Sequence, residues 1–298
     1  MHIWPSETIF MSDKKQRHYF DMLGRILKLY FARPADCQTL VTQSYDRISS
    51  SYDQSWTNHM RGLTESLINR LAPPTGSKCI DLTCGTGYAS ELLARCSSGE
   101  VTGVDASSGM LEKAEENCGD LCRFVNSDVL DFLKQQEKGS CDIITCCWGL
   151  GYSKPIAVIR EIARVLKPGG KAAVIDNSIF SLREIMSCSF LTFAESPEKL
   201  ENLMRFKFLT GPGMLGLFYR ISGLTKIYSS QGSKTYYARS GKEAIDRLTV
   251  TGAAAGFEYA CRPEDKDQIY SRFAELIEEK YKDEIPIVHR YLSGIAVK

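Results

Sequence analysis

Two glycines are separated by one residue in the stretch CIDLTCGTGYAS, which covers residues 79–90. The stretch opens with an apolar step that includes an acid, Asp81, and Gly85 and Gly87 follow shortly after it. Closely spaced glycines between a strand and a helix let the backbone approach a ligand, because they lack a side chain and tolerate positive φ. The pattern therefore predicts a ligand-binding loop for either a phosphate or a nucleoside.

The residues around the glycines argue against the common phosphate loops. A Walker loop needs Lys followed by Ser or Thr after its last glycine, and this chain has Tyr88 and Ala89 there. A dinucleotide loop needs a third glycine at the position of Ser90. Asp105 stands 20 residues after Gly85, which fits an acid that binds ribose hydroxyls. These residues predict a ligand that contains a nucleoside.

Asp81 narrows the choice of ligand. A carboxylate at the mouth of a diphosphate-binding turn would repel the phosphates. It suits a cationic cofactor instead, either by accepting a hydrogen bond from an amino group or by ordering the loop. S-adenosylmethionine has a ribose, an adenine, an ammonium and a sulfonium, and it has no phosphate. The loop therefore favours this cofactor.

The elements that must position these residues follow from the apolar patterning. From residue 79 onward short apolar runs alternate with helical patterns, which is typical of a parallel α/β sheet. The expected strands are 78–82, 100–105, 122–128, 141–147 and 171–176, and the expected helices are 87–96, 109–118 and 155–170. Residues 12–70 are predicted helical and 177–240 irregular, followed by a helix, a turn and a strand in 242–260 and a last strand at 291–298.

Four segments resemble, in order, the motifs of class I S-adenosylmethionine-dependent methyltransferases. They are IDLTCGTGYASELL, VTGVDASSGMLEKAEENC, FVNSDVLDF and the region from CDIITCCWGLGY to KPGGKAAVID. The match covers about residues 45–180 and is nearest to the ubiquinone/menaquinone-biosynthesis enzymes and their small-molecule relatives, which fold a helix similar to YDRISSSYD (45–53) over the cofactor. The resemblance implies an α/β, Rossmann-like, mostly parallel seven-stranded sheet with helices on both faces. It also implies an N-terminal helical cap at 1–70 and a methyltransferase domain at 71–298, with a lid insertion after strand 5 at about 177–240.

Two positions depart from the family pattern. Thr83 stands where the family usually has a glycine, which can alter the turn without abolishing it. The quinone enzymes tend to show Gly-Leu-Arg-Asn after the fourth strand, whereas this chain has Gly149-Leu150-Gly151-Tyr152. The second departure bears on the quinone substrate more than on the chemistry.

The resemblance also implies roles for individual residues. The expected cofactor-binding set is Tyr52, Asp81, Thr83, Cys84, Gly85, Thr86, Gly87, Asp105, Ala106, Met110, Ser127, Asp128, Val129, Cys147 and Trp148. Asp105 would accept from the ribose hydroxyls, with capping of the following helix as the alternative. Asp128 would accept from the adenine amino group beside the Val129 amide, or it is an ordinary turn residue. Met110 would pack on adenine, or it is a core methionine.

The methyl-transfer end of the site is predicted from aromatic residues. Tyr45, Tyr52 and Asp53 would close over the methionine part, or they pack within their helix. Trp148 and Tyr152 follow the fourth strand, where they would shield the sulfonium or hold the acceptor. Methyl transfer needs alignment and exclusion of water more than acid–base catalysis. Tyr152 and His59 are the candidate catalytic residues, with His59 as the base if one is needed, although an exposed helix histidine is the plainer interpretation.

The composition of the chain bears on whether it is a nucleic-acid-binding, metal-binding, membrane or secreted protein. The 298 residues carry 37 basic and 36 acidic side chains, a balance that argues against a general nucleic-acid binder. The eleven cysteines match no metal or disulfide framework, so we expect reduced thiols and no metal. The sequence has no run of eighteen apolar residues, and its start lacks the apolar core of a secretory signal, with Met1 or Met11 as the first residue. We therefore expect a cytoplasmic protein.

The prediction for function is S-adenosylmethionine-dependent C- or O-methylation of a small lipophilic molecule. The alternatives are a catalytically inactive S-adenosylmethionine-binding regulator and an NAD-dependent oxidoreductase. The apolar, glycine-spotted segment 206–221 would line an apolar acceptor pocket or touch a membrane, and the basic, apolar helix around Arg17–Arg33 is compatible with peripheral membrane contact. The plainer interpretation is that both segments pack on the sheet.

Overall fold

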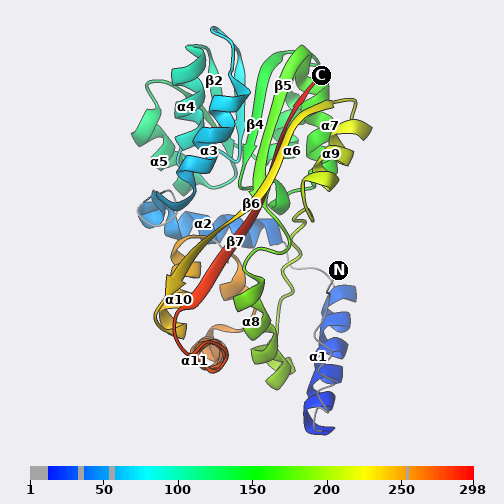
Figure 1. Cartoon of the computed structure of the whole chain (residues 1–298), viewed down its shortest axis with the longest axis vertical. Coiled ribbons are helices and arrows are strands. Elements are labelled where there is room, and N and C mark those ends of the chain that lie inside the picture. Colours follow the sequence, from blue (N-terminus) through cyan, green and yellow to red (C-terminus); the bar gives the residue numbers. More distant parts are fainter. Residues whose placement is uncertain (1–12, 33–36, 54–57, 253–254) are drawn as a thin grey trace.

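The computed structural model describes residues 13–32, 37–53, 58–252 and 255–298, without the side chains of residues 13–17, 58 and 59. Its centre is a seven-stranded sheet with the strand order β3-β2-β1-β4-β5-β7-β6 (Figure 1). The strands are β1 (Cys79–Leu82), β2 (Val101–Asp105), β3 (Arg123–Asn126), β4 (Cys141–Cys147), β5 (Leu166–Asn177), β6 (Thr225–Ala238) and β7 (Ile285–Val297). The first five pair in parallel, and β7 runs antiparallel between β5 and β6. The expected Rossmann-like fold class is confirmed.

Helices cover both faces of this sheet. One face packs against α3 (Asn58–Leu71), α4 (Tyr88–Ser97) and α5 (Ser108–Cys118), and the other against α6 (Val129–Gln135), α7 (Pro155–Val165) and α9 (Pro212–Ile221). The central strands β1 and β4 are almost entirely buried, which explains why their sequences are continuous apolar runs rather than alternating patterns. Because β1 lies between β2 and β4, the strand order reverses there, and a crevice opens at the carboxyl ends of these strands.

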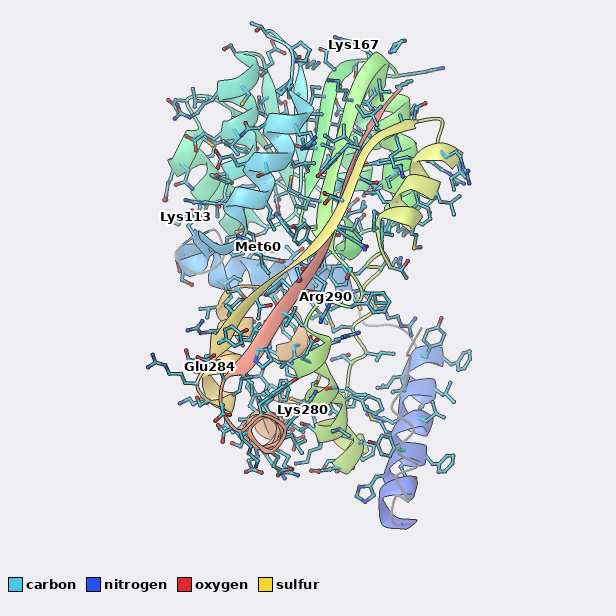
Figure 2. All side chains as sticks on the ribbon, viewed as in Figure 1. Met60, Lys113, Lys167, Lys280, Glu284 and Arg290 are labelled. Carbon is cyan, nitrogen blue, oxygen red and sulfur yellow. The ribbon has the colours of Figure 1, made fainter. Side chains whose placement is uncertain are left out.

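A second helical module sits below the sheet. The strands β6 and β7 extend beyond the other five as a two-stranded ribbon, which Figure 1 shows running down to α8 (Arg183–Glu195), α10 (Gly241–Val250) and α11 (Lys266–Lys280). This module has its own core, which includes Ile185, Phe273 and Ile287. Figure 2 shows Lys167 at the top of the molecule and Lys280 and Glu284 at the far end of the ribbon.

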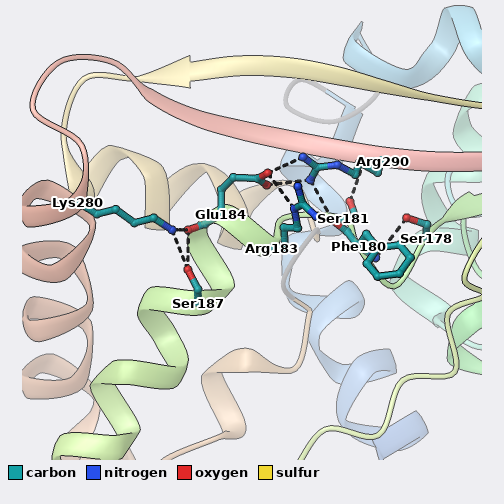
Figure 3. A network of polar contacts seen from close by, with 8 residues as sticks. All are labelled: Ser178, Phe180, Ser181, Arg183, Glu184, Ser187, Lys280 and Arg290. Carbon is teal, nitrogen blue, oxygen red and sulfur yellow. Dashed lines mark hydrogen bonds and ion pairs between the residues drawn. The ribbon is translucent and has the colours of Figure 1, made fainter. Parts of the chain in front are cut away.

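A polar network fixes α8 between β7 and α11 (Figure 3). The Arg290 guanidinium pairs with the Glu184 carboxylate and donates to the Phe180 carbonyl oxygen at 3.0 Å, while Lys280 donates to the Glu184 carbonyl oxygen at 2.8 Å and to Ser187 Oγ at 2.9 Å. Burial alone would raise the pKa of the Glu184 carboxyl. The hydrogen bonds and charge of Arg290 outweigh this effect and lower the pKa to about 2. The network therefore stays ionised across the physiological pH range.

The N-terminal helices join the two parts of the molecule. α2 (Cys37–Tyr52) packs on α5 and α10 and crosses below the sheet, and α1 (Asp13–Phe31) packs on α8 of the helical module (Figure 1). α3 contributes Leu67, Ile68 and Leu71 to the core on the sheet. The division into a cap at 1–70 and a domain at 71–298 stays a prediction.

Three expectations for the later elements are wrong. The segment 177–240 is not irregular, because it contains α8, α9 and the long edge strand β6. The strand expected at the end of 242–260 is absent from the described part, where residues 257–259 form a 3-10 turn, and β6 takes its place in the sheet. The expected helix 155–170 ends at Val165, because the Pro-Gly-Gly segment already belongs to β5.

Candidate cofactor site

A cavity opens at the carboxyl ends of β1, β2 and β4, between these strand ends and α2. Its lining residues are Gln38, Val41, Thr42, Tyr45, Tyr52, Met60, Arg61, Thr64, Thr83, Cys84, Gly85, Thr86, Tyr88, Ala89, Asp105, Ala106, Ser107, Met110, Asp128, Val129, Cys147, Trp148, Gly149, Tyr152 and Ser153. The structure therefore brings together all of the predicted cofactor-binding residues except Asp81, Gly87 and Ser127. The position at the switch of strand order is where doubly wound sheets bind their ligands.

The two glycines of the loop, Gly85 and Gly87, have different surroundings. Gly85 has φ +55°, and no atom lies within 4 Å of the place where a Cβ would stand, so that its backbone borders open space in the cavity. Gly87 has φ +90°, and a Cβ there would lie 2.8 Å from Cys118 Sγ on α5. Gly87 is therefore required for packing between α4 and α5, and its assignment to cofactor contact is corrected.

Thr83 adopts a conformation that normally requires glycine. Its φ is +56°, which is strained for a β-branched residue. Its hydroxyl donates to the carbonyl oxygen of Cys147 at 3.2 Å, and its side chain occupies the space that a Cβ on Gly149 would need, at 2.5 Å. The departure from the family pattern therefore leaves the turn intact at the cost of local strain.

Asp81 is fully buried beneath the loop rather than in the cavity. Its carboxylate accepts from Ser90 Oγ at 2.7 Å, in the first turn of α4, and from Thr145 Oγ1 at 2.6 Å, on β4. Burial raises the pKa of Asp81 to about 6, although both hydrogen bonds lower it. Direct contact with the cofactor is thus contradicted, whereas the alternative of ordering the loop agrees with these bonds.

Asp105 lies at the end of β2, between the glycine loop and the start of α5. Its carboxylate accepts from the Gly85 amide and from the Ser107 amide, both at 2.9 Å, and it remains half-buried in the cavity wall. The helix cap of α5 is Ser107, whose hydroxyl accepts from the Met110 amide, so that Asp105 is not the cap. Burial raises the pKa of Asp105 above its usual value. Ala106 and Met110 line the cavity beside it.

Asp128 follows β3 and caps the helix α6. One carboxylate oxygen caps α6 by accepting from the Leu130 and Asp131 amides at 2.8 and 3.0 Å. The other accepts from the Gln38 amide nitrogen of α2, and Asp128 and Val129 both line the cavity. Ser127 points its hydroxyl to the Asp128 carbonyl oxygen and does not line the cavity. Asp128 is therefore a helix cap that also lines the cavity, and its contact with adenine stays a prediction.

Near the end of β4, the aromatic side chains of Tyr45, Tyr52, Trp148 and Tyr152 line the cavity. The rings of Tyr52 and Tyr152 each lie 6.0 Å from the Tyr45 ring, edge to face, and the Tyr45 hydroxyl donates to the Tyr152 hydroxyl at 3.3 Å. Trp148 has φ +65°, and its indole N–H donates to Thr64 Oγ1 at 2.9 Å. This end of the cavity is therefore apolar, with a few fixed hydroxyls.

Of the two candidate catalytic residues, the structure describes the side chain of Tyr152 but not that of His59. Burial raises the pKa of the Tyr152 hydroxyl to about 12, and it raises the pKa of Tyr45 and Tyr52 well above the usual value. These tyrosines keep their protons at neutral pH and can donate hydrogen bonds, but they are not general bases. The backbone of His59 is in the first turn of α3, and its side chain lies outside the described residues.

The segment 206–221 does not line the cavity as expected. Leu215 and Tyr219 of α9 are buried in the core on one face of the sheet. Phe206 and Phe208 pack behind the Tyr152 ring, each at 5.4 Å. These residues therefore pack rather than line the cavity, whereas contact of the segment with a membrane stays a prediction.

Several cavity residues were missed from the sequence. α3 contributes Met60, Arg61 and Thr64, and α2 contributes Gln38, Val41 and Thr42. The α2 residues precede Tyr45 by seven, four and three positions, which places them on the same helix face as this tyrosine. That spacing was a usable signal, whereas nothing in the sequence distinguished α3 from a helix that only packs on the sheet.

The described residues contain no group of His, Cys, Asp and Glu side chains that could hold a metal ion. The eleven cysteines are all free thiols, and most are buried. No helix in the described ranges has both the length and the hydrophobicity to cross a membrane.

Comparisons with known proteins identify similar methyltransferases. A family model described as a methyltransferase domain matches residues 79–170. Demethylmenaquinone methyltransferase of Staphylococcus epidermidis is 29% identical over 201 residues, which are 60% of this chain and 80% of the relative. The enzyme of the same name from Lactococcus lactis is 35% identical over 152 residues, which are 46% of this chain and 58% of the relative. The crystal structure of the YcgJ protein from Bacillus subtilis, at 16% identity, shares the fold with a TM-score of 0.54 over 80% of this chain and 98% of its own.

The fold and the cavity define a Rossmann-like methyltransferase. Together with the match of residues 79–170 to a methyltransferase domain and the similarity to demethylmenaquinone methyltransferases, they support a class I S-adenosylmethionine-dependent methyltransferase. It is an enzyme that uses a cofactor of the S-adenosylmethionine type.

Proposed function

We propose that this enzyme transfers the methyl group of S-adenosyl-L-methionine to a carbon or oxygen atom of a small lipophilic molecule. The observation that carries the proposal is the aromatic wall of Tyr45, Tyr52, Trp148 and Tyr152 at the end of β4. Apolar walls with a few placed hydroxyls are typical of sites for lipophilic ligands. The relatives named as demethylmenaquinone methyltransferases support an acceptor of this kind.

The acceptor need not be the quinone of those relatives. The resemblance places their arginine at Gly151, where a Cβ would lie 2.2 Å from the Phe208 ring. The Phe208 ring, which packs on Tyr152, therefore leaves no room for a side chain at position 151, where the quinone enzymes tend to have an arginine. We propose an acceptor that offers no anionic group at this position.

The residues of the cavity align the methyl group of the cofactor with the acceptor. The cofactor supplies an electrophilic methyl group on a sulfonium. The open backbone at Gly85 leaves room for the methionine part, the Asp105 carboxylate accepts from the ribose, and Asp128 with Val129 faces the adenine. The tyrosines and Trp148 exclude water and hold the acceptor, but they remove no proton at neutral pH. The acceptor therefore brings its own ionised or electron-rich nucleophile.

The amino-acid end of the cofactor has a candidate partner in Arg61. Its guanidinium lies 4.7 Å above the Tyr88 ring and 3.8 Å from the Asp53 carboxylate, and it lines the cavity. Its Nε is buried and has no hydrogen-bond partner among the described residues. A buried guanidinium N–H without a partner is costly, and a carboxylate satisfies it.

We expect Arg61→Met to weaken binding of S-adenosylhomocysteine by about 1.5–3 kcal/mol, because one charge-assisted contact to the carboxylate is lost. Methionine keeps an apolar side chain of similar length. The control ligand is 5′-methylthioadenosine, which lacks the amino acid and is expected to bind both proteins equally. Calorimetry that finds the same loss for both ligands would assign Arg61 a structural role only.

The acceptor class is tested by turnover of matched acceptors with and without a hydrocarbon tail. We expect faster turnover of the tailed acceptor, since burial of each methylene contributes about 0.8 kcal/mol. Equal turnover would contradict a lipophilic acceptor. Absence of methyl transfer to any acceptor in a broad panel, with S-adenosylhomocysteine still bound, would favour the inactive regulator instead.

A further inference from the structure

The helix α1 has two apolar faces, and the rest of the protein uses one of them. Met22, Ile26 and Leu29 face the helical module, where Met22 is buried among residues of α8 and α11. The Arg25 guanidinium donates to the Leu200 carbonyl oxygen at 2.8 Å on the same side. α1 is therefore attached to the molecule along this inner face.

The opposite face carries a second apolar row. It consists of Phe20, Leu23, Leu27, Tyr30 and Phe31, which we call the outer stripe. Their spacing of three and four residues places them on one side of the helix. All five are exposed, with Phe20 at 73% and Phe31 at 82% of full exposure. Single exposed apolar residues are ordinary, but a continuous row marks an interaction surface.

The outer stripe continues onto the neighbouring helix. The exposed ring of Tyr19 stacks on the ring of Phe190 of α8 at 6.1 Å, and Phe190 is itself exposed. Met186, one turn earlier on α8, is exposed as well. The surface is therefore broader than a single helix seam.

Charge decides which partner fits this surface. Besides Arg25, which faces the helical module, the sequence of α1 has the four basic residues Lys14, Lys15, Arg17 and Lys28, against the acids Asp13 and Asp21. The whole chain is balanced at 37 basic and 36 acidic residues, so the excess is local. A two-fold contact between two copies of α1 would bring like charges together. An apolar helix face beside basic residues instead suits the interface of an anionic lipid bilayer.

The attachment of α1 connects this surface to the cavity. The Arg205 guanidinium donates to the carbonyl oxygens of Leu29 and Tyr30, at the end of α1, and lies 4.5 Å above the Tyr30 ring. The next residue, Phe206, packs on Tyr152 in the cavity wall. A bilayer at the outer stripe would therefore adjoin the segment that supports the aromatic end of the site.

We propose that the outer stripe seats the protein on an anionic lipid bilayer, with α1 in the plane of the interface. The inference goes beyond the proposed function and does not depend on the acceptor, because membrane attachment can be measured without one. It requires only that the apolar row enters the acyl boundary while Lys28, which is exposed, meets the headgroups.

The test is flotation of the full chain with two kinds of vesicle, phosphatidylcholine alone and an equal mixture with phosphatidylglycerol. We expect flotation with the anionic vesicles, reduced by salt. The variant Phe20→Gln/Leu27→Gln/Phe31→Gln should lower the bound fraction by more than about tenfold, because each large apolar side chain withdrawn from the interface costs more than 1 kcal/mol. The matched control, Leu121→Gln/Leu217→Gln/Ile227→Gln, changes three exposed apolar residues elsewhere and should float like the wild type.

Three results would overturn the proposal. The first is failure of the wild-type chain to float with either vesicle, and the second is equal loss of flotation in the control variant. The third is a wild-type dimer in lipid-free buffer that the outer-stripe variant converts to a monomer, which would assign the surface to a second copy. Unchanged circular dichroism and binding of S-adenosylhomocysteine show that each variant is folded.

Discussion

Asp105→Ala will bind S-adenosylhomocysteine at least about a hundredfold more weakly than the wild-type protein, which corresponds to two charge-assisted hydrogen bonds of about 1.5–3 kcal/mol each. The Asp105 carboxylate is fixed at the end of β2 by the amides of Gly85 and Ser107 and remains open to the cavity. Those two bonds leave further lone pairs of the carboxylate available to the ribose hydroxyls of a bound cofactor. Isothermal titration calorimetry on the purified variant measures the loss directly.

A ligand change separates the ribose contact from damage to the loop. The wild-type protein should bind a dideoxyribose analogue of S-adenosylhomocysteine much more weakly than the parent compound, whereas Asp105→Ala should bind the two alike. This cycle isolates the interaction of Asp105 with the hydroxyls. If the variant still distinguishes the two ligands as the wild type does, another residue holds the ribose.

The cofactor motifs were predictable because their signals are local. β1 and β4 are continuous apolar runs that are buried on both faces, and each is followed within a few residues by its functional turn. Asp105 stands at a fixed distance from Gly85 because one helix and one strand separate them in any fold of this kind. The different surroundings of Gly85 and Gly87 could not be predicted. They depend on whether the cavity or α5 lies next to each glycine in the folded chain.

The missed elements depend on contacts between distant segments. β6 is an edge strand whose side chains alternate between exposed and half-buried, and its sequence has little of the apolar alternation of a core-facing strand. Its place is set by antiparallel pairing with β7, from Thr225 opposite Val297 to Ala238 opposite Ile285. The contribution of Arg61 to the cavity likewise depends on how α3 packs beside α4, which no local pattern encodes.

We expect Gly85→Val to abolish binding of S-adenosylhomocysteine while the protein remains folded. A valine side chain would enter the open part of the cavity next to the backbone, where no protein atom lies within 4 Å of the Cβ position. The steric block adds to the cost of about 1–2 kcal/mol for a non-glycine residue at a φ of +55°. Calorimetry measures the loss of binding, and the Tm of the unliganded variant measures the loss of stability.

The chain offers a matched control for that variant. Gly139 also has positive φ, +69°, and also has open space at its Cβ position, but it lies in the turn before β4 and does not line the cavity. Gly139→Val should therefore lower the free energy of unfolding by a similar amount and leave binding unchanged. Gly87→Ala should show a third behaviour, with lower stability caused by the contact with Cys118 on α5. If Gly85→Val binds S-adenosylhomocysteine as tightly as the wild type, the glycine loop does not hold the cofactor.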